Sequence, residues 1–422
     1  MASRIGQAMS ASPLKGIAIE WRLGLIARGA GLPDPRALCA WWPMQPYIRS
    51  HTSMRGVAAL LVVAYHLQFG AQSYLPFESA TPFFKRGYLW VDLFFILSGF
   101  IISYSARMDE RAPYDWAQIK TFIVHRFARI YPLHVAALFM LAAVTFAIQF
   151  VRFLAGKPVS LDMLSPTSIL TFFEQLFLLN AWSVTGRVSW NIPSWSISAE
   201  WAAYMLFPLL AALVARWRGA SLAAFGLLAI AFYAWVGLTT GVLDIVKGAA
   251  IGRCLAGFGL GMILYTQRAR FAALGDRQLG FLQAVGLTLV LATMCFGLND
   301  VLAMPGFFLL VAATWPDRGW LTVPLKTRPL HWLGDISYSV YLNHFWVLRL
   351  WHFVSRPVLD RLDLPPMLER AITVAGAFPL VVAASALTFH YLEQPAREAI
   401  QAAYRRRRHR ATSALQAGKP VT

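Results

Sequence analysis

The sequence predicts an all-α integral membrane protein with about ten transmembrane helices and both termini in the cytoplasm. Three observations lead to this class. The chain is 58% hydrophobic and 14% charged, whereas a soluble globular domain is about one quarter charged. Apolar windows of roughly 17 to 22 residues recur from residue 57 to residue 391. Most of the 38 Lys and Arg residues fall in the tails and in alternate connections, which places those segments in the cytoplasm.

The predicted spans have boundaries that are good to several residues. In chain order they are 55–73, 88–106, 131–151, 195–215, 220–238, 248–266, 279–297, 299–316, 334–354 and 371–391. The long outer connection, 152–194, contains SILTFFEQLFLLNAW, an amphipathic and aromatic stretch that we expect to lie at the outer membrane interface.

Three regions follow from these spans. Residues 1–54 are a cytoplasmic N-terminal tail, for which disorder is one interpretation, and they lack the apolar core and cleavage site of a secretory signal. Residues 55–397 form the membrane domain, and 398–422 form a basic cytoplasmic tail. The run YRRRRHR at 404–410 predicts an anchor on the anionic inner leaflet.

The net charge of +18 does not predict nucleic-acid binding, because the basic residues lie between spans instead of forming one aromatic-interleaved patch. Cys39, Cys254 and Cys295 form neither a disulfide framework nor a zinc cluster, and no metal-binding spacing occurs. We therefore expect no metal, and the sequence does not indicate an oligomeric state.

The first span reads RGVAALLVVAYH and places a permanent cation and an ionisable ring in a hydrophobic segment. On a helix, Arg55 and His66 share one face within about 20° and lie about 16 Å apart along the axis. With Arg55 at the cytoplasmic mouth, His66 is expected about halfway into a hydrocarbon core of ~30 Å. Such a group faces a cavity or a partner and is a functional candidate. The alternative is a neutral histidine that only joins two helices.

A second basic cluster, HRFARIYP at 125–132, places Arg126 and Arg129 on one helical face of the cytoplasmic side. Paired guanidinium groups suit phosphate, because their planar forks donate hydrogen bonds in parallel. The alternative is a positive-inside stop signal. Together with Arg55, these residues predict an anion-binding mouth above a tunnel that leads to His66. Coenzyme A, which carries phosphates at one end and a thioester at the other, has the matching shape.

Two lone carboxylates lie toward the opposite side. Asp92 begins the second span and Glu200 lies early in the fourth, each in an aromatic setting where an unpaired charge is costly. Either is expected to orient or charge-balance His66, or to bind acceptor hydroxyl groups, and an interfacial location is the alternative. We predict catalytic roles for His66, Glu200 and Asp92.

Candidate substrate-binding residues are Trp195, Tyr338 and His344. Trp195 belongs to a tryptophan cluster that suits either an interfacial belt or stacking on sugar faces. His344 is a second intramembrane histidine, for which packing is the alternative. Ser98 lacks the nucleophile-elbow spacing. The stretch GFGLG at 257–261 predicts close helix contacts.

Six segments taken together resemble the membrane-bound acyltransferase-3 family. In order they are RGVAALLVVAYH, DLFFILSGFII, RFARIYPLH, PSWSISAEWAAYMLFP, GDISYSVYLNHF and FHYLEQPAR. The resemblance implies a ten-helix enzyme of the bacterial inner membrane that uses acyl-CoA, with acetyl-CoA expected first, to O-acylate surface polysaccharide, lipopolysaccharide or secreted carbohydrates. Its expected partners are acyl-CoA, a carbohydrate or glycolipid acceptor and membrane lipids.

The resemblance assigns residue roles by position. His66 matches the catalytic histidine, Arg55 its paired basic residue, and Arg126 and Arg129 the RxxR pair, which we assign to donor binding. Glu200 and Glu393 match the two motif glutamates. Two mechanisms are left open: His66 removes the proton of the acceptor hydroxyl directly, or it forms a covalent acyl-histidine. The functional alternatives are a glycolipid transporter or flippase, and a polysaccharide polymerase or glycosyltransferase.

Overall fold

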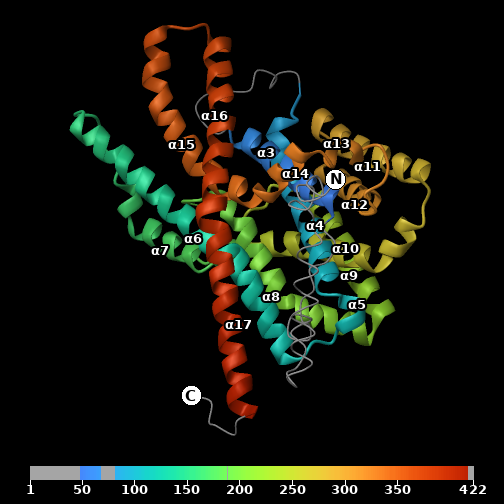
Figure 1. Ribbon diagram of the computed structural model, residues 1–422. Coiled ribbons are helices and arrows are strands. Elements are labelled where there is room, and N and C mark those ends of the chain that lie inside the picture. The colour runs from blue at the N-terminus through green and yellow to red at the C-terminus, as the bar shows by residue number, and fades with distance from the viewer. Residues whose placement is uncertain (1–47, 68–80, 188, 417–422) are drawn as a thin grey trace, which may run out of the picture. The chain divides into compact units, whose positions relative to one another are not determined.

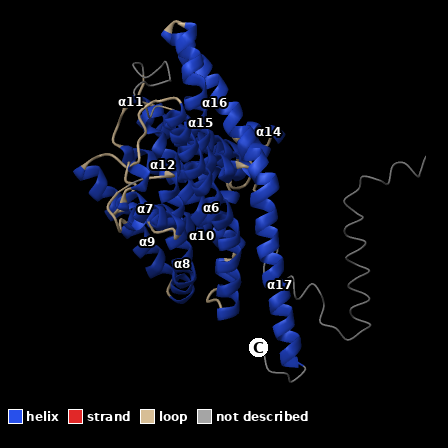
Figure 2. Ribbon diagram, turned by 90° about the vertical axis from the view of Figure 1, so that its left-hand side faces the viewer, coloured by secondary structure: helices blue, strands red, loops and turns tan. Residues whose placement is uncertain are grey.

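The computed structural model describes residues 48–67, 81–187 and 189–416, with side chains up to residue 410. All regular structure in these ranges is helical (Figure 2). The elements run in the order α3 (Arg49–His66), η1 (Phe84–Leu89), α4 (Trp90–Ser105), α5 (Met108–Arg111), α6 (Trp116–Leu154), η2 (Asp162–Leu164), α7 (Pro166–Leu176), η3 (Asn180–Trp182), η4 (Ile192–Ser194), α8 (Trp195–Arg216), α9 (Arg218–Thr239), α10 (Ala250–Ala272), α11 (Asp276–Phe296), η5 (Asp300–Leu302), α12 (Ala303–Thr314), α13 (Thr322–Leu325), α14 (Arg328–Asp335), α15 (Ser337–Leu362), α16 (Pro366–Thr388), η6 (Phe389–Glu393) and α17 (Gln394–Gln416).

Six helical segments in the described residues are long and apolar enough to cross a membrane. They are Phe84–Ser105, Trp116–Leu154, Ile192–Arg216, Arg218–Thr239, Asp276–Phe296 and Pro366–Arg410. The other four predicted spans correspond to α3, α10, α12 and α15, which are shorter or less apolar. The protein is thus an all-helical membrane protein, and ten spans with two cytoplasmic termini stay a prediction.

The first helix begins six residues before the predicted start of the membrane domain. Ser50 and His51 are buried, and they bond to carbonyl groups of α12 and its C-terminal end. Ser50 Oγ donates to Thr314 O at 2.8 Å, and a ring nitrogen of His51 lies 3.0 Å from Val311 O. The helix thus starts before the predicted span, because these polar side chains find partners inside the protein, and the domain boundary at residue 54 stays a prediction. The N-terminal tail and the end of the predicted first span lie outside the described residues.

Helices α4 and α10 pack along each other through glycines. A Cβ atom on Gly99 would lie 2.0 Å from Phe258 O, and one on Gly261 would lie 2.2 Å from Ile96 O. Only glycine permits this approach of two backbones. The close helix contact that GFGLG predicted is confirmed.

Helices α15 and α16 form an antiparallel hairpin, and α16 continues through a π-helical turn into α17, which runs beside α6 (Figures 1 and 2). Thr121 of α6 lies within hydrogen-bond distance of Tyr404 and Arg408 of α17. The predicted basic tail is therefore helical up to residue 416 and contacts α6, and its place in the cytoplasm stays a prediction. This arrangement places Glu393, in the π-helical turn, beside Arg129 of α6.

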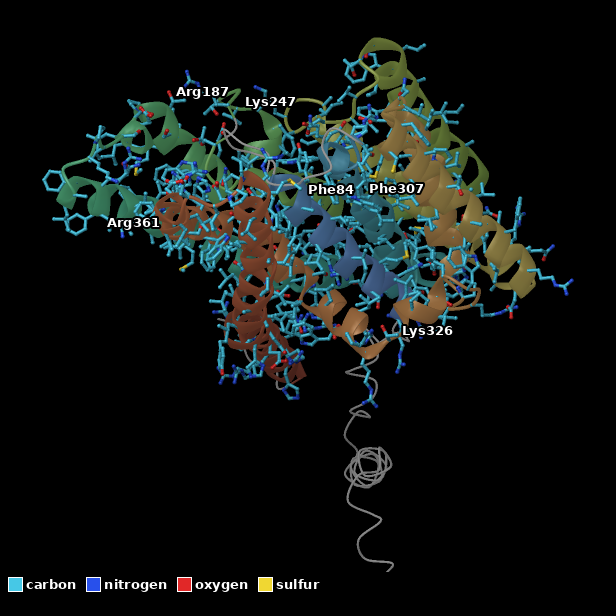
Figure 3. All side chains as sticks on the ribbon, turned by 90° about the horizontal axis from the view of Figure 1, so that it is seen from above. Phe84, Arg187, Lys247, Phe307, Lys326 and Arg361 are labelled. Atoms are coloured by element: carbon cyan, nitrogen blue, oxygen red, sulfur yellow. The ribbon has the colours of Figure 1, made fainter. Side chains whose placement is uncertain are left out.

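The long connection between α6 and α8 contains α7, whose side chains Leu170 and Phe173 are exposed. It meets the loop after α9, where Lys247 Nζ donates to Gly186 O at 2.6 Å, beside Arg187 (Figure 3). The predicted amphipathic segment is present as a helix, and its place at the membrane interface stays a prediction.

Candidate active site

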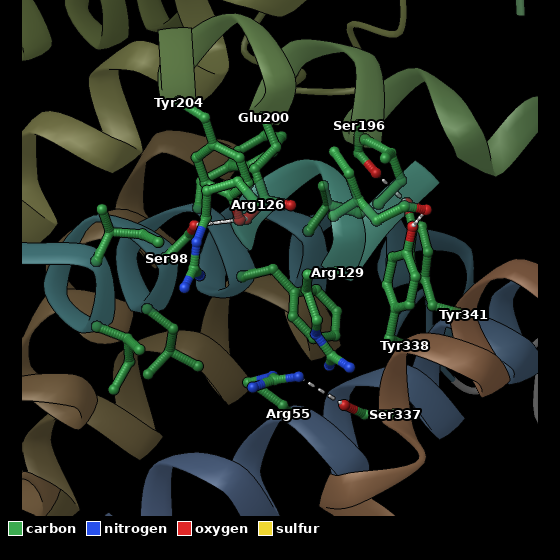
Figure 4. A pocket seen from close by; sticks show the side chains of 18 residues that line it. Arg55, Ser98, Arg126, Arg129, Ser196, Glu200, Tyr204, Ser337, Tyr338 and Tyr341 are labelled. Atoms are coloured by element: carbon green, nitrogen blue, oxygen red, sulfur yellow. Dashed lines mark hydrogen bonds between the residues drawn. The ribbon is translucent and has the colours of Figure 1, made fainter. Parts of the chain in front are cut away.

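A pocket of about 130 Å³ lies where α3, α4, α6, α8 and α15 converge (Figure 4). Its wall combines aliphatic and aromatic side chains, mostly of α4, with polar groups from all five helices. The polar lining residues are Arg55, Ser98, Arg126, Arg129, Ser196, Glu200, Tyr204, Ser337, Tyr338 and Tyr341. The structure thus brings five of the nine predicted site residues into one cavity.

The three predicted donor-binding arginines share this pocket. Arg55 Nη2 donates to Ser337 Oγ at 3.2 Å, and Arg129 is paired with the carboxylate of Glu393. Arg126 forms no ion pair within the described residues, and its buried Nε atom has no hydrogen-bond partner there. A guanidinium group without a carboxylate partner is therefore available to an anion in the pocket.

Helix α6 positions the two arginines of the RxxR motif. The helix begins with a capping box in which Asp115 and Gln118 bond to each other's backbone. Residues three apart lie on one helical face, so Arg126 and Arg129 both point into the cavity (Figure 4). The guanidinium carbon of Arg129 lies 5.3 Å from the ring centre of Tyr338, close enough for a cation–π contact.

Glu200 faces the arginines from α8. Its Oε1 atom accepts hydrogen bonds from Ser98 Oγ at 2.5 Å and from Tyr204 at 2.6 Å (Figure 4). These two donors hold the carboxylate in the wall of the pocket. Glu200 thus lines the cavity, and its catalytic role stays a prediction.

The two tyrosines of α15 have their hydroxyl groups engaged in the protein. Tyr338 donates to Ile130 O at 2.6 Å, and Tyr341 donates to Pro193 O at 3.0 Å. The Tyr341 hydroxyl also lies 2.7 Å from Ser196 Oγ. Both residues therefore present ring faces, more than hydroxyl groups, to the cavity.

His66 is the last residue of α3, and its ring contacts the ring of His344. Its Nδ1 atom lies 3.2 Å from His344 Nε2, and His344 lies 6.1 Å from Tyr341 between ring centres. Neither histidine lines the pocket. Among the described residues the lining of this pocket does not reach His66, and a tunnel from the arginines to His66 stays a prediction. Tyr341, which lines the pocket and contacts His344, connects the two regions.

Asp92 and Trp195 lie outside the pocket lining. Both carboxylate oxygens of Asp92 accept from Arg253, at 3.0 and 2.6 Å, and both side chains are fully buried. Trp195 packs on the same guanidinium group, with its ring centre 5.2 Å from the guanidinium carbon. Asp92 is thus charge-balanced by Arg253, and not by His66 as the sequence predicted.

One acidic residue of the connecting loops lies near the histidines. Tyr65, whose ring centre is 4.8 Å from that of His66, donates to Asp244 at 3.3 Å. Burial raises the pKa of the Asp244 carboxyl, against the nearby charge of Arg253. Within the described residues, no three His, Cys, Asp or Glu side chains gather into a metal-binding group.

The fold is thus that of a helical membrane protein, and three arginines line its pocket. Comparison with known families gives the class of reaction. A family model for the acyltransferase domain matches residues 51–389, so the chain belongs to the membrane-bound acyltransferase-3 family and is an acyltransferase.

Named relatives agree with this assignment. The chain is 29% identical to the acyltransferase MdmB of Streptomyces mycarofaciens over 72% of this chain and 79% of the relative. It is 23% identical to the peptidoglycan O-acetyltransferase OatA of Listeria monocytogenes, over 83% of this chain and 56% of the relative. A putative peptidoglycan O-acetyltransferase of Bacillus subtilis, YrhL, is also 23% identical, and 55% of it is covered. The chain thus spans just over half the length of these two relatives. No solved structure matches significantly.

Proposed function

We propose that the protein transfers an acyl group from acyl-CoA to a hydroxyl group of a cell-envelope carbohydrate, and that this acyl group is acetyl. The reaction would take place in a bacterial inner membrane, with the donor entering from the cytoplasm. Two relatives named as peptidoglycan O-acetyltransferases support both the acetyl group and the carbohydrate acceptor.

The observation that carries the donor assignment is the guanidinium group of Arg126. It lines the pocket without an ion-pair partner in the described residues, and its Nε donor is buried and unsatisfied there. Leaving such a group unpaired costs about 1 to 3 kcal/mol, and more for a charged group. A phosphate oxygen of CoA would remove this cost, and Arg55 lies in the same cavity as a second cation.

The chemistry is assigned to His66. In the direct route, its neutral ring takes the proton of the acceptor hydroxyl while that oxygen attacks the thioester carbonyl carbon. The carbon–sulfur bond breaks and the thiolate of CoA takes up the proton. A positioned base contributes about 10²- to 10⁴-fold to such a rate. In the covalent route the ring nitrogen attacks first and the thiolate of CoA leaves as the carbon–sulfur bond breaks. The acylated ring then passes its acyl group to the hydroxyl oxygen as the nitrogen–carbon bond breaks, and the hydroxyl proton goes to the thiolate.

In this proposal Tyr341 moves to let the thioester pass from the arginine pocket to His66, because its ring lines the pocket and contacts His344. Two polar contacts at its hydroxyl, to Pro193 and Ser196, hold the ring in the pocket wall. Movement of a side chain at this point would gate entry of the thioester, which is consistent with the enclosure that protects a reactive acyl group from water.

The experiment is acetyl transfer from radiolabelled acetyl-CoA by the purified protein in detergent, with an oligosaccharide of N-acetylglucosamine as acceptor. We expect label in the glycan and loss of transfer in His66→Ala. Arg126→Lys keeps the charge but loses the parallel N–H donors of the guanidinium group, so its KM for acetyl-CoA should rise at least tenfold. Arg270→Lys, at an exposed position, is the control and should have the KM of the unmodified protein.

Three results would point elsewhere. Full transfer by His66→Ala would overturn the role of that ring. Transport of a glycolipid across vesicles without acetyl-CoA consumption would favour a flippase. Chain elongation from a nucleotide sugar would favour a glycosyltransferase.

A further inference from the structure

The rings of His66 and His344 form a pair that joins two helices far apart in sequence. His66 ends α3, His344 lies within α15, and these helices pack against each other. His344 is fully buried, while His66 keeps a small exposed fraction. The ring centres lie 4.8 Å apart with an interplanar angle of 53°, so the contact is a directed nitrogen-to-nitrogen approach and not a face-to-face stack.

Backbone carbonyl groups fix the protons on both rings. His66 Nδ1 lies 3.0 Å from Val62 O, and His344 Nδ1 lies 3.2 Å from Val340 O. A carbonyl oxygen can only accept, so each Nδ1 atom must carry a hydrogen. A neutral imidazole has one N–H, and both rings are therefore Nδ1–H tautomers with their lone pairs on Nε2.

The contact between the rings then has a single direction. His344 Nε2 carries a lone pair and accepts, while His66 Nδ1–H donates and is shared between His344 and Val62 O, at 3.2 and 3.0 Å. The remaining lone pair of His66 sits on Nε2, the ring nitrogen farthest from its own backbone. This is the nitrogen that a base or an acyl acceptor requires.

We infer that His344 is a positioning residue, which holds His66 in the Nδ1–H tautomer so that Nε2 meets the acyl donor and acceptor. The inference rests on the proposed function and replaces the substrate-binding role that the sequence indicated for His344. The arrangement follows the logic of a catalytic triad, in which a third group orients the base, with a neutral imidazole as the orienting group.

The pair accounts for the proton at every stage. When His66 Nε2 takes the acceptor proton, the ring becomes a cation whose Nδ1–H still donates to the lone pair of His344. When Nε2 returns that proton to the thiolate of CoA, the starting tautomer is restored. In the covalent route the same Nε2 lone pair forms the bond to the acyl carbon as the carbon–sulfur bond breaks. When the hydroxyl oxygen then takes the acyl group, the nitrogen–carbon bond breaks and the hydroxyl proton goes to the thiolate of CoA. His344 neither gains nor loses a proton in either route.

Aromatic neighbours hold both rings at the required angles. Phe345 meets the ring of His66 edge-on, with ring centres 5.9 Å apart and an interplanar angle of 90°. Tyr341 packs on His344 at 6.1 Å between ring centres. Because Tyr341 also lines the arginine pocket, a change at the pocket wall reaches the histidine pair through one ring contact.

The test compares His344→Gln with His344→Met, two side chains of similar length. The carboxamide oxygen of glutamine can reach the place of Nε2 and accept from His66, whereas the methionine thioether is a weak acceptor. Release of free thiol from acetyl-CoA, with the N-acetylglucosamine oligosaccharide as acceptor, gives kcat and KM. We expect kcat of the Met variant to fall about 100-fold with an unchanged KM for acetyl-CoA, and the Gln variant to recover at least a tenth of the original kcat.

A control and a second readout make the outcome decisive. His352, exposed on the same helix, is replaced by Met as the matched control and should leave kcat unchanged. Nitrogen NMR of the protein with labelled histidine, with the His66 signals assigned from the His66→Ala spectrum, reports the tautomer even if the His344 variants do not fold. We expect Nδ1–H at His66.

The inference is overturned if the Gln and Met variants have equal kcat, or if His66 is the Nε2–H tautomer. These results would leave the proposed function standing, provided that the unmodified protein releases thiol from acetyl-CoA and His66→Ala does not. Absence of thiol release from the unmodified protein would instead remove the proposed function itself.

Discussion

Arg129 of the RxxR motif is paired with Glu393, whose second carboxylate oxygen accepts from Ser339 of α15 at 2.7 Å. Glu393 is 2% exposed and lies in the π-helical turn between α16 and α17. The pair therefore ties the C-terminal helices to α6 at the pocket. It also neutralises one of the three pocket cations, so our proposal makes Arg126 the principal ligand of the donor's phosphate groups.

Glu393→Ala should destabilise the protein, because Arg129 would keep its charge in a largely buried place without a partner. Breaking a buried ion pair costs about 3 to 5 kcal/mol, and the partial exposure of Arg129 places this pair at the lower end. The check is thermal unfolding in detergent. Glu398→Ala, at an exposed site on α17, is the control and should be nearly neutral. Equal unfolding temperatures for the two variants would contradict this account.

Asp92→Asn should lower stability by about 3 to 5 kcal/mol, because it leaves the fully buried Arg253 uncompensated. The double replacement Asp92→Leu with Arg253→Met removes both charges and should recover most of the loss. Acetyl transfer per folded molecule should stay near the original value in Asp92→Asn. A stable Asp92→Asn protein with no transfer would instead support the catalytic role that the sequence predicted.

Gly261→Ala should separate α4 from α10, because the added Cβ would lie 2.2 Å from Ile96 O. Overpacking of this kind costs about 1 to 3 kcal/mol, and here the obstacle is backbone. Gly259→Ala, on the same helix, meets only Phe225 Cβ at 3.7 Å and should be tolerated. Thermal unfolding of the two variants measures the difference. A Gly259→Ala protein as unstable as Gly261→Ala would contradict the assignment of the effect to the close backbone approach at Gly261, because helix propensity alone favours alanine over glycine.

Tyr341→Trp should slow acetyl transfer at least tenfold while CoA binding stays unchanged, because the larger ring obstructs passage from the pocket to His66. Tyr341→Phe keeps the ring, loses the contacts to Pro193 and Ser196, and should retain transfer. Rate and CoA affinity are measured separately on each protein. An unimpaired Tyr341→Trp enzyme would mean that the thioester reaches His66 by another route.

Much of the pocket could be predicted from sequence because its residues follow local rules. Arg126 and Arg129 lie three apart on one helix, and Arg55 shares a helix with His66 as the spacing predicted. Glu200 was identifiable as a lone charge in an apolar segment. Each of these arguments needs only helical periodicity and the cost of a charge in a membrane.

The rest depended on contacts between distant segments. Arg253 lies 161 residues from Asp92, and two lone opposite charges in separate spans were the only signal that they pair. Ser98 was set aside for want of a hydrolase elbow, yet it holds Glu200. Tyr204, one helical turn after Glu200, could have been found from that spacing. The pairing of His66 with His344 depends on how α3 meets α15, which no local pattern specifies.

In the fold, too, local sequence predicted the helices, whereas contacts between distant segments could not be predicted. The apolar windows located the helices, but the start of α3 was placed too late. Its first turn is polar, and Ser50 and His51 are buried only because α12 supplies carbonyl partners. The basic composition of residues 398–422 predicted a tail but gave no sign of a contact partner, and Tyr404 and Arg408 lie within hydrogen-bond distance of Thr121 of α6.

The central claim is that the arginine pocket binds the phosphorylated part of an acyl-CoA donor. Calorimetric titration of the purified protein with CoA and with pantetheine, which lacks the nucleotide phosphates, tests it most directly. We predict that CoA binds at least tenfold more tightly than pantetheine, and that Arg126→Ala removes this preference while Arg270→Ala keeps it. Equal affinity for the two ligands, or a preference for CoA that survives in Arg126→Ala, would contradict the account.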